Sequence, residues 1–363
     1  MSSIVTPLKG LWLGTLTAPK RVRLYVWLSL GTQILIVVTG GLVRLTGSGL
    51  GCPTWPKCTD DSLTSTAEMG IHGLIEFGNR VLTIVLLVVA LLTFATVFRE
   101  HPAKREMTPG LVAFFGSVVL LIAGLALATR AIDLLALIVL GISAIGILGF
   151  ALLFVLRANS AQRRGLVVPA FGLGFGIILQ AVVGGITVLA GLNSWIVGVH
   201  FVISMVLIAI ATVLVSRATL VFRGLVSPLA SALSWPTVVV GAITVLVGVL
   251  VTGAGPHAGD AATPRNGLDL ELWQHLHSYP GYLMLALILL QVGFQLRSNP
   301  GGWTQTSNRI LVLLLLASVI QAIVGVLQAR MGVPEYLVAI HMFGAALLAS
   351  LLTFQLLALR PKR

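Results

Sequence analysis

Charged residues are scarce in this sequence. Aspartate, glutamate, lysine and arginine make up 9% of its 363 residues, whereas a soluble globular domain averages about 25%. Hydrophobic residues reach 57%, so we expect the folded surface to face lipid. Only helices and closed barrels cross a bilayer, and the apolar runs here lack the alternating pattern of a barrel strand. The sequence therefore excludes a soluble domain and predicts an all-α polytopic membrane protein.

Acidic residues are the rarer of the charged types, with 11 against 23 lysines and arginines. The resulting net charge of +12 is typical of nucleic-acid-binding proteins. The basic residues, however, lie in short segments between apolar runs, where they set membrane orientation, so we expect no nucleic acid as a partner. A small-residue cleavage site is also missing near the N-terminus, and the first apolar run is too long for a signal peptide. We therefore predict an uncleaved first span.

Ten apolar runs have the length of about 20 residues that a transmembrane helix needs. If the N-terminus is inside, seventeen of the 23 basic residues lie on the inner side and five lie in outer loops. The positive-inside rule then predicts that both termini are cytoplasmic. The predicted spans are 24–44, 67–98, 109–129, 134–156, 166–190, 195–216, 232–252, 272–296, 310–329 and 335–359.

An internal repeat divides the chain. Residues 180–200 and 321–341 align without a gap, with seven identical positions, and both segments end in histidine. A looser similarity links 39–49 to 245–255. Repeats of this kind tend to place sites at equivalent positions in the two halves. We therefore predict two pseudo-symmetric four-helix bundles with one additional helical hairpin. The predicted parts are a tail at 1–23, an N-terminal bundle at 24–223 with the hairpin at about 108–157, and a C-terminal bundle at 224–363.

Four histidines inside predicted spans are the main candidates for binding residues, because ionisable side chains in a membrane are costly and usually functional. They are His72, His200, His277 and His341, each about one to two turns inside the outer end of its helix. Imidazole is a good axial ligand of haem iron. The matched depths predict two haem sites, one between His72 and His200 and one between His277 and His341. For any single histidine, the alternative is a hydrogen-bonded structural role.

His275 competes with His277 for the second site. The two side chains lie about 200° apart on a helix of 3.6 residues per turn, so only one can face the bundle interior. The sequence around them favours His277.

Glu76 is the only acidic residue placed deep in a predicted span. It shares a helical face with His72 and Asn79, at spacings of i, i+4 and i+7. A buried carboxylate costs several kcal/mol unless it is paired or neutral, so Glu76 is a candidate catalytic residue. The alternative is an ion pair with Arg80. The second half has residues 278–280 there and no carboxylate, which favours one site for chemistry and one for electron relay.

The chain has only two cysteines. Cys52 and Cys58 lie in a predicted outer loop, facing a compartment in which disulfides persist, and the alternative is a pair of free thiols. The glycines of this loop allow tight turns and close approach to a ligand, so we expect the loop to cover the first site. A zinc centre is disfavoured, since its ligands converge on one point whereas the histidines are split between two bundles.

These motifs resemble the haem A synthase family. The segments that carry the resemblance are GGLVRLTGSGLGCPTWPKC, HGLIEFGNR, QAVVGGITVLAGLNSWIVGVH and IHMFGA. The likeness spans most of the chain except about 108–157. It implies an oxidoreductase acting on a CH or CH2 group, which converts the C8 methyl of haem O to a formyl group by two hydroxylations and loss of water, for cytochrome c oxidase biogenesis.

The resemblance also implies roles for individual residues. The C-terminal half would hold haem b between His277 and His341, and the N-terminal half would hold the substrate haem O with His200 as a ligand. Glu76 matches the essential carboxylate of the family, and Cys52 and Cys58 match its paired loop cysteines.

Two features depart from the family pattern. Many members have histidine three residues after the glutamate, where this chain has Asn79, and His72 is the alternative ligand on the same helical face. The inserted hairpin is the second departure. Arg44 and Arg80 are candidates for binding the haem propionates, on the basis of charge and position.

The expected setting follows from these assignments. We expect a bacterial plasma membrane with the lipid bilayer as solvent, a haem O synthase that supplies the substrate, and an electron acceptor that the sequence does not identify. The chain is compatible with a homo-oligomer. Two rival hypotheses are a di-haem electron-transfer protein without haem-modifying activity and a transporter, although transporter sites lie at the midplane of the membrane.

Overall fold

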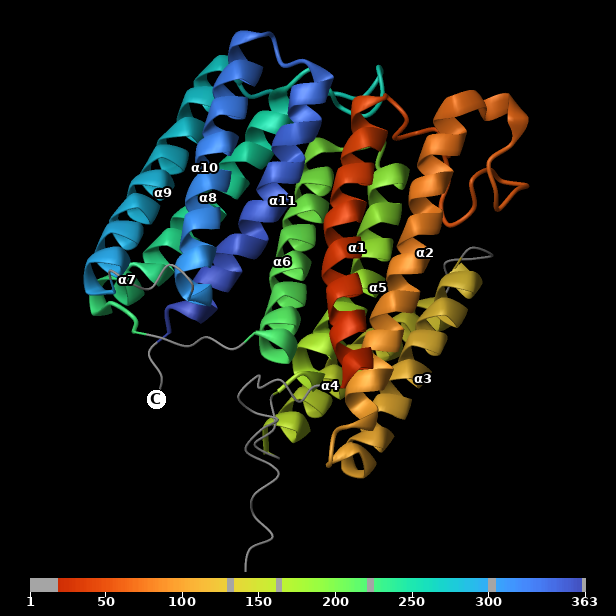
Figure 1. The fold of residues 1–363 in the computed structure, drawn as a ribbon. Helices are drawn as coiled ribbons and strands as arrows, with labels where there is room; N and C mark the ends of the chain where they lie inside the picture. The colour runs from red at the N-terminus through yellow and green to blue at the C-terminus, as the bar shows by residue number, and fades with distance from the viewer. Residues whose placement is uncertain (1–18, 129–133, 161–164, 221–224, 300–304, 361–363) are drawn as a thin grey trace, which may run out of the picture.

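The computed structural model describes residues 19–128, 134–160, 165–220, 225–299 and 305–360. Helices dominate this part of the chain (Figure 1). Their bounds are α1 Lys20–Leu45, η1 Ala67–Met69, α2 Gly70–Arg99, α3 Lys104–Ala128, α4 Leu134–Ser160, α5 Val167–Leu189, α6 Ser194–Thr219, α7 Pro228–Ala232, α8 Ser234–Ala254, α9 Leu270–Ser298, α10 Thr306–Arg330 and α11 Glu335–Ala358.

Ten spans in the described residues are long and apolar enough to cross a membrane, which confirms the predicted fold class. Most boundaries agree with the sequence prediction to within a few residues. The first helix begins earlier than predicted, at Lys20, inside the predicted tail. The first 18 residues of that tail lie outside the described residues.

The long helices form two four-helix bundles (Figure 1). Helices α1, α2, α5 and α6 pack in a ring, and α8, α9, α10 and α11 form the second ring. The two bundles meet where α11 packs against α6 and α1, and where α6 packs against α8. Each repeat segment therefore contributes a corresponding helix pair, α5–α6 in the first bundle and α10–α11 in the second. The predicted boundary at residue 223 lies outside the described residues.

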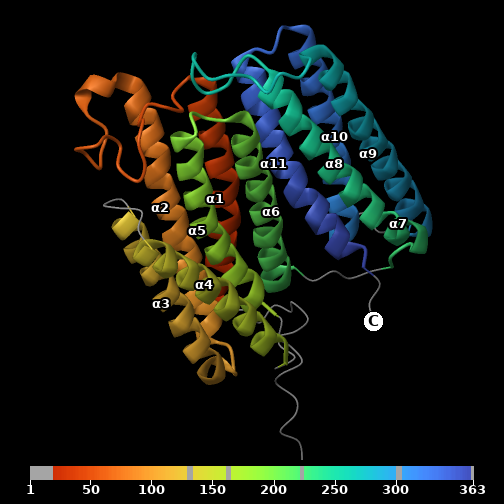
Figure 2. The same cartoon turned by 180° about the vertical axis from the view of Figure 1, so that it is seen from behind.

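The inserted hairpin consists of α3 and α4, which pack closely on each other. Figure 2 shows the pair beside the first bundle, over its lower part. Phenylalanines attach the hairpin there, with Phe171 of α5 at the centre: its ring centroid lies 4.5 Å from that of Phe154 on α4 and 5.1 Å from that of Phe114 on α3. Phe94 of α2 lies 6.0 Å from Phe171. The residues joining α3 to α4, 129–133, lie outside the described part.

Replacing Phe171 by alanine is expected to loosen the hairpin. Between helices in lipid, packing contacts replace the hydrophobic driving force, and a large-to-small change leaves a cavity that costs about 2 kcal/mol. Reversible unfolding in mixed detergent and SDS micelles measures the loss. Ile122→Ala is the matched control, because this α3 side chain is 62% exposed and should leave stability unchanged. Equal loss in both variants would contradict this assignment.

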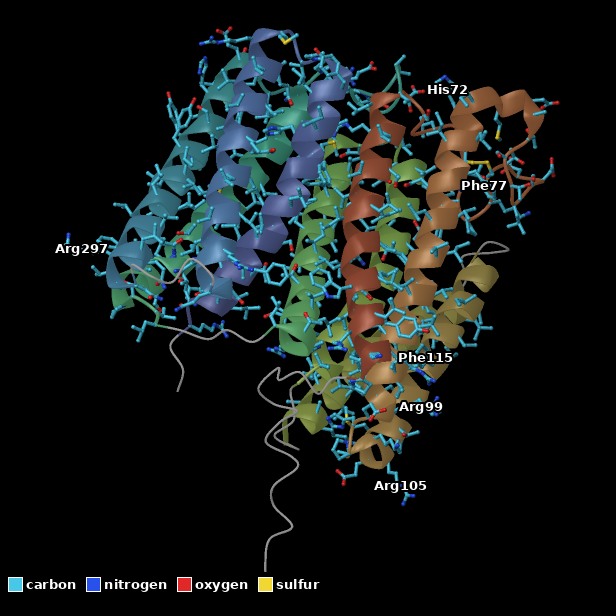
Figure 3. All side chains as sticks on the ribbon, in the orientation of Figure 1. His72, Phe77, Arg99, Arg105, Phe115 and Arg297 are labelled. Atoms are coloured by element: carbon cyan, nitrogen blue, oxygen red, sulfur yellow. A yellow bond between two sulfur atoms is a disulfide. The ribbon has the colours of Figure 1, made fainter. Side chains whose placement is uncertain are left out.

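Loops at one end of the bundles form a structure that we call the cap, made of residues 46–66, 190–193 and 255–269. Gly49 N donates to Gly259 O over 2.8 Å and so joins the loops of the two halves. Leu192, held at a φ of 58°, lies against both glycines. Figure 3 shows His72 at the cap end and Arg99, Arg105 and Arg297 toward the opposite end.

Candidate functional site

A repeated hydrogen bond fixes one histidine in each bundle. Gln180 Nε2 on α5 donates to the carbonyl of His200 on α6 over 2.9 Å. In the second bundle, Gln321 Nε2 on α10 donates to the carbonyl of His341 on α11 over 2.8 Å. Each histidine is the seventh residue of its helix. The two halves therefore hold these histidines by the same interhelical contact, at the same depth below the cap.

A glycine faces each of these imidazoles. A Cβ atom added at Gly184 would lie 3.2 Å from His200 Cε1, and one added at Gly325 would lie 3.2 Å from His341 Cε1. The Nδ1 atoms of both rings are buried without a hydrogen-bond partner among the described residues. A buried imidazole nitrogen without a partner is unfavourable, and Nε2 of each neutral ring is an available metal ligand.

The second bundle brings two imidazoles together. His277 on α9 and His341 on α11 have ring centroids 6.2 Å apart with planes at 73°. Two imidazoles that coordinate one metal from opposite sides, through bonds of about 2 Å, have ring centres about 6 Å apart. A Cβ added at Gly248 on α8 would lie 2.8 Å from His277 Cε1. The ring spacing fits an iron ion held between the two imidazoles.

His277 is the member of its pair that faces the bundle interior. Its ring lies against α8 and His341, whereas His275 is exposed. The geometry agrees with the choice made from the sequence.

The first bundle does not repeat this pairing. His72 is the third residue of α2 and is exposed, and its Nδ1 is hydrogen-bonded to Ser48 Oγ in the cap, 2.9 Å away. It lines an open cavity of about 580 Å³ together with cap residues of both halves, including Leu50 and Asp260. His72 therefore lies beneath the cap, whereas His200 lies against α5.

Asn79 occupies the α2 side of the first bundle. Its Oδ1 accepts a hydrogen bond of 2.8 Å from Thr39 Oγ1 on α1, and its amide nitrogen lies beside Gly40. The amide is thus engaged within the bundle between α1 and α2.

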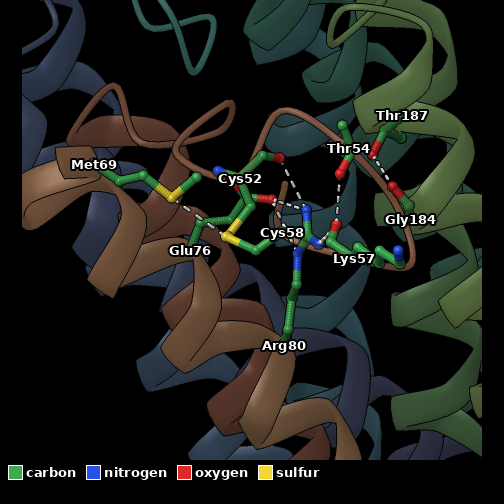
Figure 4. Close-up of polar contacts among 9 residues, drawn as sticks. All are labelled: Cys52, Thr54, Lys57, Cys58, Met69, Glu76, Arg80, Gly184 and Thr187. Carbon is green, nitrogen blue, oxygen red and sulfur yellow. Dashed lines mark hydrogen bonds and ion pairs between the residues drawn. A yellow bond between two sulfur atoms is a disulfide. The ribbon is translucent and has the colours of Figure 1, made fainter. Parts of the chain in front are cut away.

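Glu76 is buried, with 5% of its surface exposed, and both of its oxygens are bonded (Figure 4). Oε2 accepts from the backbone N–H of Cys52 over 2.6 Å. Oε1 accepts from Arg80 Nη2 over 2.6 Å and from Arg80 Nε over 3.2 Å. The ion pair considered from the sequence is therefore present, and it satisfies the buried charge.

Arg80 also binds the loop that follows α1. It donates to the carbonyls of Cys52 and Lys57, each over 3.0 Å. Cys52 and Cys58 form a disulfide, which is the first of the two alternatives for these cysteines. Glu76 and Arg80 together clamp the disulfide loop onto α2.

The same loop reaches across to α5. The indole of Trp55 lies in direct contact with Gly185, so closely that a Cβ there would overlap the ring. Gly185 neighbours Gly184, which faces His200. The loop thus joins the carboxylate on α2 to the helix turn beside His200.

Arg44 reaches into the second half. Its Nε donates to the carbonyl of His257 over 2.5 Å and its Nη2 to that of Thr252 over 2.7 Å. The guanidinium lines a small cavity of about 40 Å³ with Gln274 of α9 and Gln328 of α10. Gln328 Oε1 is buried there without a partner among the described residues. Arg44 therefore lies at the cap end of the second bundle.

Sequence reasoning missed several of these residues. The repeat could have predicted the glutamine–histidine hydrogen bonds, because the aligned segments share Gln180 with Gln321 and Gly184 with Gly325. No such pattern predicts the contact of Trp55, because its partner Gly185 is distant in sequence.

These observations define a class: a multi-pass helical membrane protein whose two bundles each carry a half-buried histidine that faces a glycine. Comparison with known proteins identifies the relationship. The sequence model of the COX15-CtaA family, described as a cytochrome oxidase assembly protein, matches residues 23–124. Over residues 23–124 the chain is therefore similar to this family.

Two curated relatives illustrate the similarity. The Heme A synthase of Geobacillus thermodenitrificans is 31% identical over 85 residues, which cover 23% of this chain and 26% of the relative. The Heme A synthase of Staphylococcus epidermidis, strain ATCC 35984, is 29% identical over 101 residues, which cover 28% and 32%. The matches thus span between a quarter and a third of the relatives' length.

Proposed function

We propose that the protein is a haem A synthase, which oxidises the C8 methyl group of haem O to a formyl group for cytochrome c oxidase biogenesis. The observation that carries the proposal is the setting of Glu76. This buried carboxylate lies within the segment that matches the family. Through the disulfide loop it is connected to the α5 turn beside His200. In the part of the second bundle that the structure describes, the histidine pair has no such buried carboxylate.

The proposed roles of the residues follow from their positions. His200 holds the substrate haem in the N-terminal bundle, about 24–223, and Glu76 lies near the methyl group to be oxidised. A carboxylate in this place takes up a proton or stabilises developing positive charge. Conversion of a methyl to a formyl group removes four electrons and four protons and adds the oxygen of one water, so an external electron acceptor is required.

The C-terminal bundle, about 224–363, is proposed to bind haem b between His277 and His341. When bound, haem b supplies one-electron transfer, and the protein contributes the two imidazoles and the glycines beside them. Arg44 is the proposed anchor for its propionates, because this guanidinium lies at the cap end of the second bundle. Arg80 has a weaker claim to a propionate, since it is bonded to Glu76 and the disulfide loop.

The proposed orientation places the cap outside and both termini in the cytoplasm of a bacterium. The arginines Arg99, Arg105 and Arg297 lie toward the end opposite the cap (Figure 3), as the positive-inside rule requires. The disulfide lies in the cap, where an oxidising compartment would preserve it. The proposed supplier of haem O is a haem O synthase in the same membrane.

One observation favours a second candidate function. Because Glu76 and Arg80 clamp the disulfide loop, the buried carboxylate has a structural use that requires no chemistry. A di-haem electron-transfer protein would need only the histidines and this clamp.

Co-expression with a haem O synthase separates the two functions. In a host that makes no haem A, membranes containing both proteins are expected to yield haem A, identified by mass spectrometry of the extracted haems. Membranes with the haem O synthase alone provide the control. Haem O without haem A, at normal levels of the protein, would reject the synthase and leave the electron-transfer protein.

A further inference from the structure

We propose that the first bundle binds its haem iron through one protein ligand, His200, and leaves the iron face toward α2 open to a small exogenous ligand such as oxygen, carbon monoxide or imidazole. The inference rests on the proposed function, because it requires haem in this bundle. It concerns coordination, however, and is tested separately from catalysis.

The α5–α6 side of the site is complete. Gln180, Gly184 and His200 repeat the glutamine–carbonyl hydrogen bond and the glycine–imidazole contact of Gln321, Gly325 and His341 in the second bundle. His200 is therefore as well placed to bind iron as its counterpart.

The opposite side differs between the two bundles. In the second bundle, His277 on α9 stands 6.2 Å from His341, measured between ring centroids. In the first bundle, α2 offers His72, whose ring is exposed and bonded to Ser48 in the cap. The backbone of the cap packs directly on the backbone of His72, since a Cβ at Gly51 would collide with the His72 carbonyl. This contact fixes the position of His72 under the cap.

Asn79 lies on the same face of α2 as His72 but two turns farther from the cap. Its carbonyl oxygen is bonded to Thr39, and the side chains that commonly bind haem iron are histidine, cysteine, methionine and tyrosine. An amide therefore leaves this side without a strong ligand.

The other side chains considered as a second iron ligand lie away from His200. The remaining histidines, His101, His257 and His275, lie at helix ends or in the cap. Both cysteines are in the disulfide, and Met69 Sδ lies beside it, 3.5 Å from Cys58 Sγ. Among the described residues, therefore, no histidine or cysteine is placed relative to His200 as His277 is placed relative to His341.

Spectroscopy of the full-length protein, purified with two haems per chain, tests the proposal. The oxidised protein is expected to show equal amounts of one high-spin and one low-spin haem by electron paramagnetic resonance. After reduction, carbon monoxide should bind about half of the haem. Two low-spin haems that do not react with carbon monoxide would overturn the proposal, as would failure to take up a second equivalent of haem on titration.

Two variants locate the open side. Asn79→His is expected to make both haems low-spin and to abolish carbon monoxide binding, whereas Asn79→Leu should leave one high-spin haem. An Asn79→His protein that binds two haems but keeps one high-spin would contradict the open face toward α2. His72→Ala is expected to keep the wild-type spectrum, and any change in the spin state of a haem would identify His72 as a ligand and overturn the proposal. If Asn79→His does not accumulate, the wild-type spectrum and His72→Ala decide the question.

The haem type distinguishes this inference from the proposed function. A high-spin, carbon monoxide-reactive haem O that is never converted to haem A supports one-sided coordination and rejects the synthase. Conversion to haem A by a protein with two low-spin haems supports the synthase and rejects one-sided coordination.

Discussion

Replacing His341 by alanine is expected to remove about half of the bound haem, specifically the low-spin component, and to stop haem A formation. The reason is the pairing of His341 with His277, since haem held between two imidazoles loses one axial ligand. His200 and its contacts lie in the other bundle, so the first haem should remain. Pyridine haemochrome analysis and optical spectra of the purified variant measure the loss.

His275→Ala is the matched control for this experiment. His275 lies two residues from His277 on the same helix but is exposed, so its replacement should preserve both haems. Full haem content in His341→Ala, or equal loss in both variants, would show that the second bundle does not bind haem through this pair.

Glu76→Gln is expected to lower haem A formation about 10²-fold or more, the range for removal of a general acid or base. Haem O or a hydroxylated intermediate should accumulate instead. Glutamine preserves the size of the side chain and can retain one of the two contacts that the carboxylate makes with Cys52 and Arg80. The extracted haems are quantified by mass spectrometry relative to the amount of protein.

Arg80→Gln separates a catalytic role of Glu76 from its structural one. This change removes the ion pair with Glu76 and the bonds to the carbonyls of Cys52 and Lys57, but it keeps the carboxylate itself and its bond from Cys52 N. If Glu76 acts chemically, its variant should be far less active than Arg80→Gln at similar haem content. Equal defects that follow proteolytic sensitivity of the disulfide loop would mean that the ion pair only holds the loop. Normal haem A output from Glu76→Gln would reject the catalytic role.

The membrane fold was predictable from the sequence because lipid imposes a simple pattern. Apolar runs of helix length had to become helices, since backbone polar groups have no other partners in a bilayer. The ten predicted spans accordingly match the observed ones. The repeat at 180–200 and 321–341 likewise placed His200 and His341 at equal depth, as the structure has them.

The site was less predictable because helical spacing says which side chains share a face and not what covers that face. His72, Glu76 and Asn79 follow the expected period, yet the cap draws His72 to Ser48 while Glu76 is buried under Cys52. Arg80 was expected at a propionate and is bonded to loop carbonyls. Those contacts depend on how residues 46–66 fold back over α2. The spacing of residues within a helix does not predict the course of such a loop.

The packing of α6 against α11 has an electrical consequence. These adjacent helices carry His200 and His341, so with haem in both bundles the two irons are ligated from neighbouring backbones in a medium that screens charge weakly. If the two bundles bind haem as proposed, an electron on one iron would change the local potential at the other and make its reduction harder. The two proposed centres would then be coupled redox sites, and the reduction potential of each would depend on the state of the other.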